Sequence, residues 1–446
     1  MYKKILIAAR GEIALRIIRA CRELGIRTVA VHSEADTESL HVKFADEDVC
    51  VGKAQPVESY LNIPRLIAAA EITGAEAIHP GYGFLAESPY FAEVCISCKL
   101  DWIGPVPALM EKMGHKSEAR RLMAEAKLPI IPGSEGIVEG EEIALKIADR
   151  IGYPVMIKAV AGGGGRGIRI VRGADELSSL FHAAGAEAEA SFGDGGLYLE
   201  KYLEAPRHIE VQIFGDGKGK AVHLRERECS IQRRHQKLIE ESPAPGISEE
   251  TREKILEYAV RGAEYVKYGS LGTVEFLLDG EGHIYFLEMN TRVQVEHPVT
   301  EMVTGVDLIK EQIRLASTGE SPLLDGHAVL RGHAIECRIN AEDTEKGFKP
   351  SPGLVSFYHP PGGPGVRVDT HLYAGYTVPP YYDSLLAKII TWGETREEAR
   401  TRMIRSLEEC VIEGVPTTIP FHLWILRHEK YINGEFDTSF IDRIGK

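Results

Sequence analysis

The sequence predicts a mixed α/β and α+β protein built from three consecutive units. Its first hundred residues alternate between short strand-like and helix-like segments, a pattern typical of an open parallel sheet. From residue 114 onward, runs of strands with flanking helices take over, which indicates an α+β unit. A third unit begins near "GHAIECRINAED" and contains the Pro- and Gly-rich segment "HPPGGPG". We therefore expect units at 1–113, 114–330 and 331–446 of the 446 residues.

The first unit is a regular β–α alternation with short connections. Asp36 lies just past the second expected strand, where a dinucleotide-binding fold places its ribose-binding acid. The first turn, "AARGEIA", has only one glycine, so the unit is expected to be a scaffold that carries one edge of a substrate site rather than a dinucleotide fold. Expected strands are 3–9, 26–33, 76–80 and 100–105, and expected helices are 11–25, 59–74 and 88–98.

The elements of the second and third units follow from hydrophobic patterning. The segment 114–130 opens the second unit as a helix, and a second helix, 248–269, precedes a hairpin at 273–290. The third unit contains a strand at 384–393 and a helix at 395–410. Further strands of the second unit are expected at 197–203, 208–216, 221–230 and 235–243.

Four consecutive glycines interrupt the stretch "KAVAGGGGRGI", residues 158–168. Fixing their conformation costs roughly 2–4 kcal/mol relative to alanine, so a ligand approached closely, or a motion, is expected to offset that cost. Strand-like segments flank the loop on both sides, and the helical pattern starts only after Arg172. The dinucleotide fingerprint needs a helix at the loop and the Walker motif needs Gly-Lys-Ser/Thr, so neither fits. We expect a flexible glycine hairpin, with a plain tight turn as the alternative.

The hairpin at 273–290 places two carboxylates together. Its turn centres near Glu281–Gly282, so Glu275 is expected opposite Glu288, with Asn290 on the same face. Two carboxylates about 4 Å apart repel by about 4 kcal/mol at an effective dielectric of about 20. A divalent ion such as Mg²⁺, completed by substrate phosphates, would relieve that repulsion; a solvated face with an arginine partner is the alternative. The opposite, apolar face is expected to carry Val274, Phe276, Leu278, Tyr285 and Leu287.

Several cationic side chains lie near these elements in the sequence. Any single one is more often a solvated charge than a ligand. Lysines at strand ends, combined with a glycine flap and paired carboxylates, instead predict a site for a nucleoside triphosphate with magnesium, closed by a mobile lid. The residues concerned are Lys116, Lys158, Lys201, His208, His235 and Lys237.

The stretch "NTRVQVEHPVTEM", residues 290–302, follows the second carboxylate strand directly. Arg292 and Gln294 could hold a small planar oxyanion at the γ-phosphate end of the site. Glu296 would then accept a proton from that oxyanion, which would be a carboxylate or bicarbonate activated by ATP. The alternative is a loop packed by its valines, with its charges facing water.

Composition excludes several classes of protein. The formal net charge is −14, which argues against nonspecific nucleic-acid binding. Apolar runs fall short of the roughly 20 residues of a membrane span, and the N-terminus lacks a signal-peptide layout. Seven scattered cysteines favour a cytoplasmic location over a disulfide framework. Cys95 and Cys98 form a lone C-x-x-C, which we interpret as two small apolar residues on one helix face.

Five stretches together resemble biotin carboxylase, of the ATP-grasp superfamily: "KAVAGGGGRGI", "RHIEVQIFGD", "ERECSIQRRHQKLIEESPAPG", "EMNTRVQVEHPVTE" and "GHAIECRINAED". The similarity runs in order over essentially the whole chain. It implies an N-terminal α/β domain, a central ATP-grasp domain with a glycine-rich lid at about 131–203, and a C-terminal biotin carboxylase domain. It also implies that ATP phosphorylates bicarbonate to carboxyphosphate, which yields CO₂ for carboxylation of the N1′ nitrogen of biotin.

The resemblance assigns roles by motif. Glu296 would be the general base, Arg338 would stabilise the enolate-like oxygen of biotin, and Lys237 and Arg292 would act beside them. Tyr82 would line the biotin pocket, while Arg292, Gln294 and Val295 would hold bicarbonate. Glu275 and Glu288, with Asn290, would bind two Mg²⁺ ions, or Mn²⁺ in their place. The nucleotide would lie among Lys116, Lys158, Gly163, Gly164, Gly165, Glu200, Lys201, Leu203, His208, Gln232, His235, Lys237, Glu275 and Glu288.

The resemblance also implies partners. The sequence lacks a Met-Lys-Met biotin-attachment motif, so we expect a separate subunit that works on biotin held by a carrier protein and cooperates with carboxyltransferase subunits. The resemblance further implies a homodimer. Acetyl-CoA carboxylase in fatty acid biosynthesis is the first expectation, and a pyruvate or other acyl-CoA carboxylase is the alternative. The remaining rivals are another ATP-grasp ligase that forms a carbonyl phosphate, a dinucleotide-dependent oxidoreductase and a non-catalytic scaffold protein.

Overall fold

The computed structural model describes residues 1–159, 168–326 and 328–445. Its N-terminal unit is a five-stranded sheet in the order β3-β2-β1-β4-β5, and every neighbouring pair in it is parallel, as predicted. Strand β3 and helix α2 were not expected from the sequence, because the edge strand is short and half-exposed and the helix has only five residues. The elements are β1 (Lys4–Ile7), α1 (Gly11–Glu23), β2 (Arg27–Ser33), α2 (Leu40–Phe44), β3 (Glu47–Gly52), α3 (Ile63–Thr73), β4 (Ala77–His79), α4 (Pro89–Ser97), β5 (Asp101–Trp102) and α5 (Pro107–Gly114).

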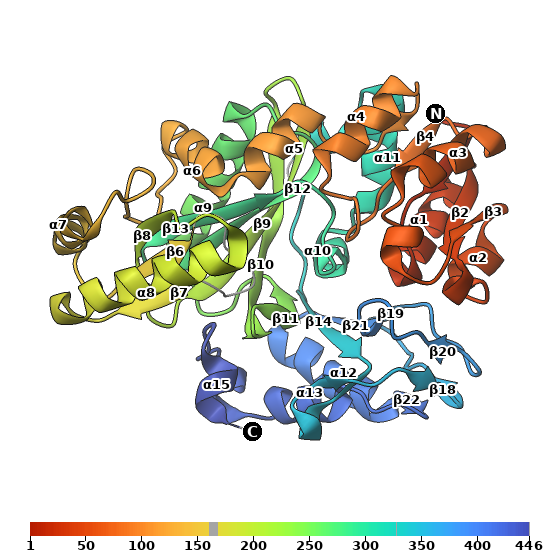
Figure 1. Ribbon diagram of the computed structural model, residues 1–446. Helices are drawn as coiled ribbons and strands as arrows, with labels where there is room; N and C mark the ends of the chain where they lie inside the picture. The colour runs from red at the N-terminus through yellow and green to blue at the C-terminus, as the bar shows by residue number, and fades with distance from the viewer. Residues whose placement is uncertain (160–167, 327, 446) are drawn as a thin grey trace.

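An eight-stranded antiparallel sheet forms the centre of the molecule, in the order β13-β12-β9-β10-β11-β14-β21-β19 (Figure 1). It crosses the expected boundary at residue 330, because β11 pairs with β14. The second and third units therefore share one continuous sheet. Its strands are β9 (Arg207–Asp216), β10 (Ala221–Arg233), β11 (Gln236–Ser242), β12 (Gly269–Leu278), β13 (Ile284–Asn290), β14 (His333–Asn340), β19 (Val366–Thr370) and β21 (Leu385–Gly393).

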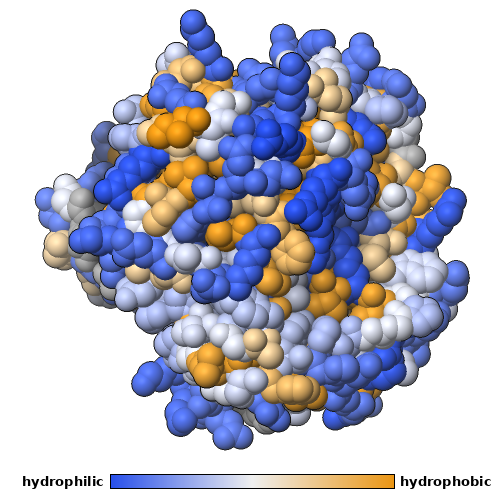
Figure 2. Space-filling model, turned by 90° about the vertical axis from the view of Figure 1, so that its right-hand side faces the viewer, coloured by the Kyte–Doolittle hydropathy of each residue, from blue (hydrophilic) through white to orange (hydrophobic). Residues whose placement is uncertain are grey.

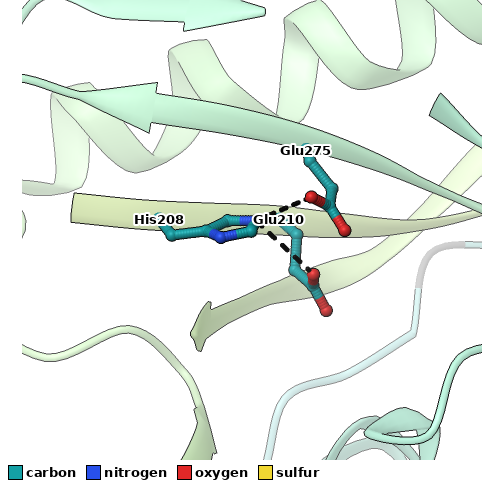
Figure 3. Close-up of side chains that lie close together, drawn as sticks. All are labelled: His208, Glu210 and Glu275. Carbon is teal, nitrogen blue, oxygen red and sulfur yellow. Dashed lines mark ion pairs between the residues drawn. The ribbon is translucent and has the colours of Figure 1, made fainter. Parts of the chain in front are cut away.

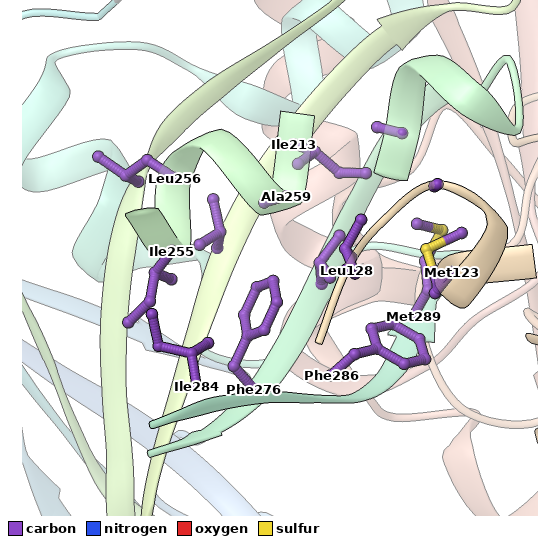
Figure 4. Packing of buried hydrophobic residues seen from close by; sticks show 14 of the residues in the cluster. Met123, Leu128, Ile213, Ile255, Leu256, Ala259, Phe276, Ile284, Phe286 and Met289 are labelled. Atoms are coloured by element: carbon purple, nitrogen blue, oxygen red, sulfur yellow. The ribbon is translucent and has the colours of Figure 1, made fainter. Parts of the chain in front are cut away.

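Helices α6 (Lys116–Glu125) and α9 (Glu249–Tyr265) cover one face of this sheet. Met123 from α6 and Ile255 from α9 pack against Phe276 and Phe286 of the sheet (Figure 4). Because side chains alternate along a strand, the apolar residues of β9 and β12 fill this core, and the polar residues between them point to the opposite face. That opposite face carries the site described below, and α10 (His297–Thr304) and α11 (Leu308–Thr318) lie beyond it.

The segment that contains the glycine loop forms a small module with its own core. Strands β6 (Val155–Ala159) and β7 (Ile168–Val171) pair antiparallel with Lys158 opposite Ile168, which agrees with the predicted strand–loop–strand. Strand β8 (Leu197–Lys201) completes the sheet, and α7 (Glu141–Ile151) and α8 (Ala174–Phe192) pack on it. We call this module the lid. Residues 160–167, which include the glycines, lie outside the described residues.

Helices of the third unit pack on β14 and β21. They are α12 (Arg396–Glu409), α13 (Ile419–Leu426), α14 (Glu429–Ile432) and α15 (Phe440–Ile444). Short strands complete the unit: β15 (Glu342–Asp343), β16 (Lys349–Pro350), β17 (Gly353–Leu354), β18 (Phe357–His359), β20 (Thr377–Val378) and β22 (Val411–Glu413).

The face of the molecule seen in the space-filling view of Figure 2 is mainly hydrophilic. The face that Figure 2 shows carries scattered apolar patches between charged side chains. A groove of about 510 Å³ beside α3 and α4 is lined largely by apolar residues, among them the exposed Tyr90. Among the described helices, none combines the length and the apolar character that crossing a membrane requires.

Candidate active site

One cavity of about 1320 Å³ gathers the residues singled out in the sequence. It lies between the polar face of the large sheet, the lid and the loop that carries Tyr82. Gly163, Gly164 and Gly165 fall outside the described residues, and the roles of the other predicted residues stay predictions. Those that line the cavity are Tyr82, Lys116, Lys158, Glu200, Lys201, Leu203, His208, Gln232, His235, Lys237, Glu275, Glu288, Asn290, Arg292, Gln294, Val295, Glu296 and Arg338.

The hairpin pairs Glu275 with Glu288, as predicted, but through a different register. Phe276 pairs with Phe286, one residue earlier than centring the turn implied, and Leu287 forms a β-bulge before Glu288. The bulge puts Leu287 and Glu288 on the same face, so both line the cavity. The expectation that Tyr285 and Leu287 belong to the apolar core face was therefore wrong. The β13 residues in the core are Ile284, Phe286 and Met289.

Glu275 is held by four partners. Its carboxylate lies 2.8 Å from His208 Nε2 and accepts a hydrogen bond of 3.0 Å from Lys237 Nζ. The side-chain amides of Asn290 and Gln294 donate to the same carboxylate at 2.9 and 2.8 Å. Burial alone would raise the pKa of Glu275, but Lys237 and His208 hold that pKa well below its usual range. The carboxylate is therefore ionised and fixed in position.

The surroundings of the Glu288 carboxylate differ from those of Glu275. Within the described part of the chain, its carboxylate forms no hydrogen bond or ion pair, although it lines the cavity beside Glu275. Burial and the neighbouring charge of Glu275 raise the pKa of Glu288, while Lys116 opposes that shift. A half-buried carboxylate without a protein partner among the described residues, next to a second carboxylate, fits a divalent cation held by few protein ligands.

Glu275 also belongs to a group of buried side chains of the kinds that bind metal ions. Figure 3 shows His208, Glu210 and Glu275 converging from β9 and β12. Glu210 already accepts hydrogen bonds of 2.5 Å from both Arg227 Nε and Lys237 Nζ. We therefore assign this group to the ion-pair network that supports the site rather than to a metal centre.

Glu296 lies between two cations. Lys237 Nζ donates to its Oε1 at 2.7 Å, and Arg338 Nη2 donates to its Oε2 at 2.9 Å. Burial would raise the pKa of Glu296, but Lys237, Arg338 and the buried Arg227 hold that pKa well below its usual range. Burial would lower the pKa of Lys237, but the carboxylates around its ammonium group raise that pKa well above its usual value. The residue proposed as proton acceptor is thus ionised, as that role requires.

The loop between β13 and α10 carries the predicted anion-binding residues. Arg292 donates to Asn290 Oδ1 at 3.1 Å and pairs with Glu87 at 2.9 Å. Gln294 accepts from Arg227 at 2.8 Å, so its amide group donates toward Glu275. Glu296 immediately precedes α10, whose amino end favours negative charge.

The lid side of the cavity holds the remaining predicted residues. Lys158 pairs with Glu200 at 3.0 Å, which links β6 to β8. Lys201 lines the cavity, but its ammonium group donates to the backbone carbonyls of Gly152 and Tyr153 at 3.1 and 2.9 Å. His235 was expected on a strand; it lies in the exposed β10–β11 turn with φ of +64°. The others are Lys116, the first residue of α6, Gln232 near the end of β10, and Leu203, which follows β8.

Sequence reasoning missed the residues that organise this network from beneath. Arg227 is fully buried, with hydrogen bonds to Glu210, Gln212, Thr273, Gln294 and Thr300. The signal was present, because His208, Glu210 and Gln212 alternate with apolar residues in "HIEVQ" and so share one strand face. The apolar wall formed by Ile131, Met156 and Leu277 carried no comparable signal.

Comparison with family models gives three matches in chain order. The N-terminal domain of biotin carboxylase matches residues 1–110, and the biotin carboxylase C-terminal domain matches residues 336–443. The ATP binding domain of the carbamoyl-phosphate synthase L chain matches residues 115–323. Together the three models span nearly the whole chain.

Individual relatives agree over the full length. Biotin carboxylase of Nostoc sp. is 56% identical over 445 residues, with 100% of both chains covered. A pyruvate carboxylase subunit of Methanothermobacter thermautotrophicus is 54% identical over 442 residues, 99% of this chain and 90% of that protein. A solved biotin carboxylase domain dimer of Hydrogenobacter thermophilus 2-oxoglutarate carboxylase, in complex with MgADP, ADP and bicarbonate, has a TM-score of 0.92 at 49% identity, covering 99% of this chain and 98% of that chain.

Proposed function

The chain belongs to the biotin carboxylase family, and we propose that the cavity beside Glu296 is where it uses ATP and bicarbonate to carboxylate biotin. ATP-dependent carboxylation of biotin is the activity that family membership gives. The observation that supports this location is the position of Glu296, buried between Lys237 and Arg338 and two residues from Gln294 in the same loop.

We assign bicarbonate to the loop from Arg292 to Glu296. Bicarbonate is a poor electrophile, so its hydroxyl oxygen must attack the γ-phosphorus of ATP, which releases ADP and forms carboxyphosphate. Arg292, Gln294 and Val295 orient the anion, and Glu296 accepts its proton as the new O–P bond forms. Substrate charge would draw Lys237 and Arg338 away from Glu296, and that loss of partners would raise the basicity of the carboxylate at the moment of proton transfer.

We assign the second step to Arg338. Carboxyphosphate breaks down to CO₂ and phosphate, and the N1′ nitrogen of biotin attacks the carbon of CO₂. The ureido nitrogen is a very weak acid, so negative charge builds on the biotin oxygen as the N1′ proton passes to the phosphate released from carboxyphosphate. The Arg338 guanidinium, fixed by Glu240 at 2.5 Å, stabilises that charge as it develops. Tyr82 forms the opposite wall of the biotin pocket.

The nucleotide site is assigned to the lid side of the cavity. Lys116 and Lys158 offer cationic groups to the phosphates, His235 lies on the same side of the cavity, and Gly163, Gly164 and Gly165 would close over the phosphates. The remaining residues assigned to the nucleotide are Glu200, Lys201, Leu203 and Gln232. Glu275 and Glu288, with Asn290 beside them, would hold Mg²⁺ or Mn²⁺, which supplies charge neutralisation for the phosphates. Lid closure over the loop would exclude water from carboxyphosphate.

We extend the proposal to assembly. We expect a homodimer, a separate carrier protein that presents biotin, and carboxyltransferase subunits that consume carboxybiotin. Relatives described as a subunit of pyruvate carboxylase and as a domain of a 2-oxoglutarate carboxylase support a multi-component enzyme and leave acetyl-CoA, pyruvate and other acceptors open. Seven free cysteines support a cytoplasmic location. The three units 1–113, 114–330 and 331–446 would supply the biotin-facing loop, the ATP-grasp site and Arg338, respectively.

One assay tests the proposal. ATP hydrolysis is measured with bicarbonate and free biotin, each omitted in turn, and with ammonia or NAD as alternative substrates. We expect turnover that needs bicarbonate and rises with biotin. Turnover that depends on ammonia would favour a carbamoyl-phosphate-type ligase, NAD reduction would favour an oxidoreductase, and absence of turnover would favour a scaffold protein.

A further inference from the structure

A buried lysine outside the predicted site contacts two of its walls. Lys388, on β21, is 0% exposed, and its Nζ donates to the backbone carbonyl of Val295 at 2.9 Å. The same Nζ lies 3.2 Å from Glu12 Oε1, in the first turn of α1. Glu12 in turn accepts a hydrogen bond from the hydroxyl of Tyr82. Through Lys388, the third unit contacts the loop that carries Val295 directly. It contacts Tyr82 indirectly, through Glu12 of the first unit.

The hydrogen bond from Lys388 to the Val295 carbonyl also affects the orientation of Glu296. A peptide unit is planar, so fixing the Val295 carbonyl also fixes the direction of the Glu296 N–H, which belongs to the same plane. Lys388 is also the direct cross-strand partner of Arg338, on the neighbouring strand β14. The lysine therefore lies beside Arg338 and contacts the peptide that precedes Glu296, yet it does not itself line the cavity.

Burial of the Glu12 carboxylate costs free energy. Glu12 is 4% exposed, its Oε2 has no hydrogen-bond partner, and burial raises its pKa to about 7 against the opposing effect of Lys388. Replacing a buried ion pair by apolar residues is often neutral or stabilising, so fold stability alone gives a weak reason for this arrangement. Holding Tyr82 and the Val295 carbonyl at a fixed separation gives a stronger one.

We propose that Lys388 and Glu12 are positioning residues for biotin carboxylation, which hold Tyr82 and the Val295–Glu296 peptide in register across the cavity. The proposal rests on the function proposed above. It predicts that loss of the pair changes the use of bicarbonate and biotin while leaving nucleotide binding unchanged, because neither residue contacts the lid side of the cavity. A residue misplaced by about 1 Å costs on the order of 100-fold in rate.

The test compares Lys388→Met, Glu12→Gln and Tyr82→Phe, alone and in pairs, in the full-length protein. Methionine keeps the length of the lysine and removes the donor, and glutamine keeps an acceptor for Tyr82 and removes the charge. We expect Lys388→Met to lower kcat at least tenfold, to raise the KM for bicarbonate and to leave the Kd for ATP within twofold. Lys388→Arg should recover part of the loss. The paired variant of Lys388→Met with Tyr82→Phe should lose less than the product of the single losses.

Arg396→Met is the matched control. Arg396, in the third unit, pairs with the buried Glu241 of β11, and neither residue lines the cavity. We expect this variant to lower the melting temperature and to keep kcat and both KM values within twofold. If Lys388→Met behaves like Arg396→Met, or if the paired losses multiply, the positioning role is wrong. Should Lys388→Met fail to fold, Glu12→Gln decides: unchanged KM values for bicarbonate and biotin overturn the proposal. A wild-type protein without biotin-stimulated turnover would instead overturn the proposed function.

Discussion

Glu275 and Glu288 are cross-strand partners on the β12–β13 hairpin, but the protein fixes only one of the two carboxylates. His208, Lys237, Asn290 and Gln294 hold Glu275, whereas Glu288 forms no such bond among the described residues. The pair thus combines one carboxylate that the protein already holds in place with one that would be held only by the bound metal. Removing the charge of Glu288 should therefore affect metal binding, whereas removing the charge of Glu275 should affect the stability of the fold.

Glu288→Gln should mainly weaken metal binding. It removes a carboxylate whose pKa is raised by burial and by Glu275, so the ligand-free protein should be equally or more stable. We expect the Mg²⁺ concentration at half-maximal activity to rise at least tenfold. Glu275→Gln should instead remove the carboxylate that faces His208 and one of the three carboxylates around Lys237, and the free energy of unfolding should fall by about 3–5 kcal/mol. Mg²⁺ titration of activity and urea unfolding measure the two effects; equal loss of stability in both variants would contradict the asymmetry.

Glu296→Gln should separate nucleotide binding from chemistry. The amide cannot accept the proton of bicarbonate, so biotin-dependent turnover should fall by about 10²–10⁴, while the Kd for ATP stays within a few-fold. Glu241→Gln is the control, because Glu241 is equally buried and paired with Arg396 but does not line the cavity. Steady-state ATP hydrolysis and nucleotide titration measure both quantities. Retained turnover in Glu296→Gln would remove the general-base assignment.

The β-bulge at Leu287 makes a deletion testable. Deleting Leu287 should let the hairpin pair regularly while Glu288 stays opposite Glu275, so folding and turnover should survive with a loss of less than about tenfold. Deleting Leu277 from the unbulged partner strand shifts the register by one and turns side chains to the wrong face. We expect that variant to lose folding, judged by thermal unfolding. Equal damage from both deletions would show that the bulge is needed for more than register.

A buried histidine should give the protein an acid-sensitive component of stability. His422 donates from Nε2 to the Arg338 carbonyl at 2.7 Å, and burial lowers its pKa from 6.5 to about 4. A depressed histidine pKa means that its contribution is complete above pH 6.5 and is lost as the pH falls toward 4. The unfolding free energy should therefore drop by about 3 kcal/mol over that window from this residue.

Replacing His422 with glutamine, which keeps a donor for the carbonyl, should make the pH dependence of unfolding shallower by that amount. Urea unfolding at pH 6.5 and 4.5 is the measurement, and His359→Gln, at an exposed histidine, is the control. If the pH dependence of the unfolding free energy is unchanged in His422→Gln, groups other than His422 cause the loss of stability at acidic pH.

The sequence was most informative where local pattern decides structure. Strand periodicity put His208 and Lys237 on strands, and the spacing around a turn placed Glu275 opposite Glu288. The predicted register paired Phe276 with Leu287, whereas the structure pairs Phe276 with Phe286. The β-bulge at Leu287 places Glu288 opposite Glu275 all the same, so the carboxylate pair was predicted correctly with a wrong register. A one-residue bulge leaves little trace in a sequence. Resemblance supplied Arg338, a residue about 40 positions beyond the nearest local motif.

The sequence was least informative about contacts between distant segments. Arg227 lies inside a strand that reads as ordinary polar alternation, and only the fold brings five partners around it. The chain from Tyr82 through Glu12 to Lys388 joins positions hundreds of residues apart. Such contacts depend on how the units pack, which periodicity along one strand cannot express.

Because β11 and β14 share backbone hydrogen bonds, the strand that carries Lys237 and the strand that carries Arg338 move as one frame. If biotin is presented by a carrier, as proposed above, it must therefore come to Arg338, because the strand that holds this residue is part of the same sheet. On the proposed assignment of the sites, a change of shape during turnover would fall to the lid, which has a core of its own, while the spacing between the strands of Lys237 and Arg338 is set when the chain folds.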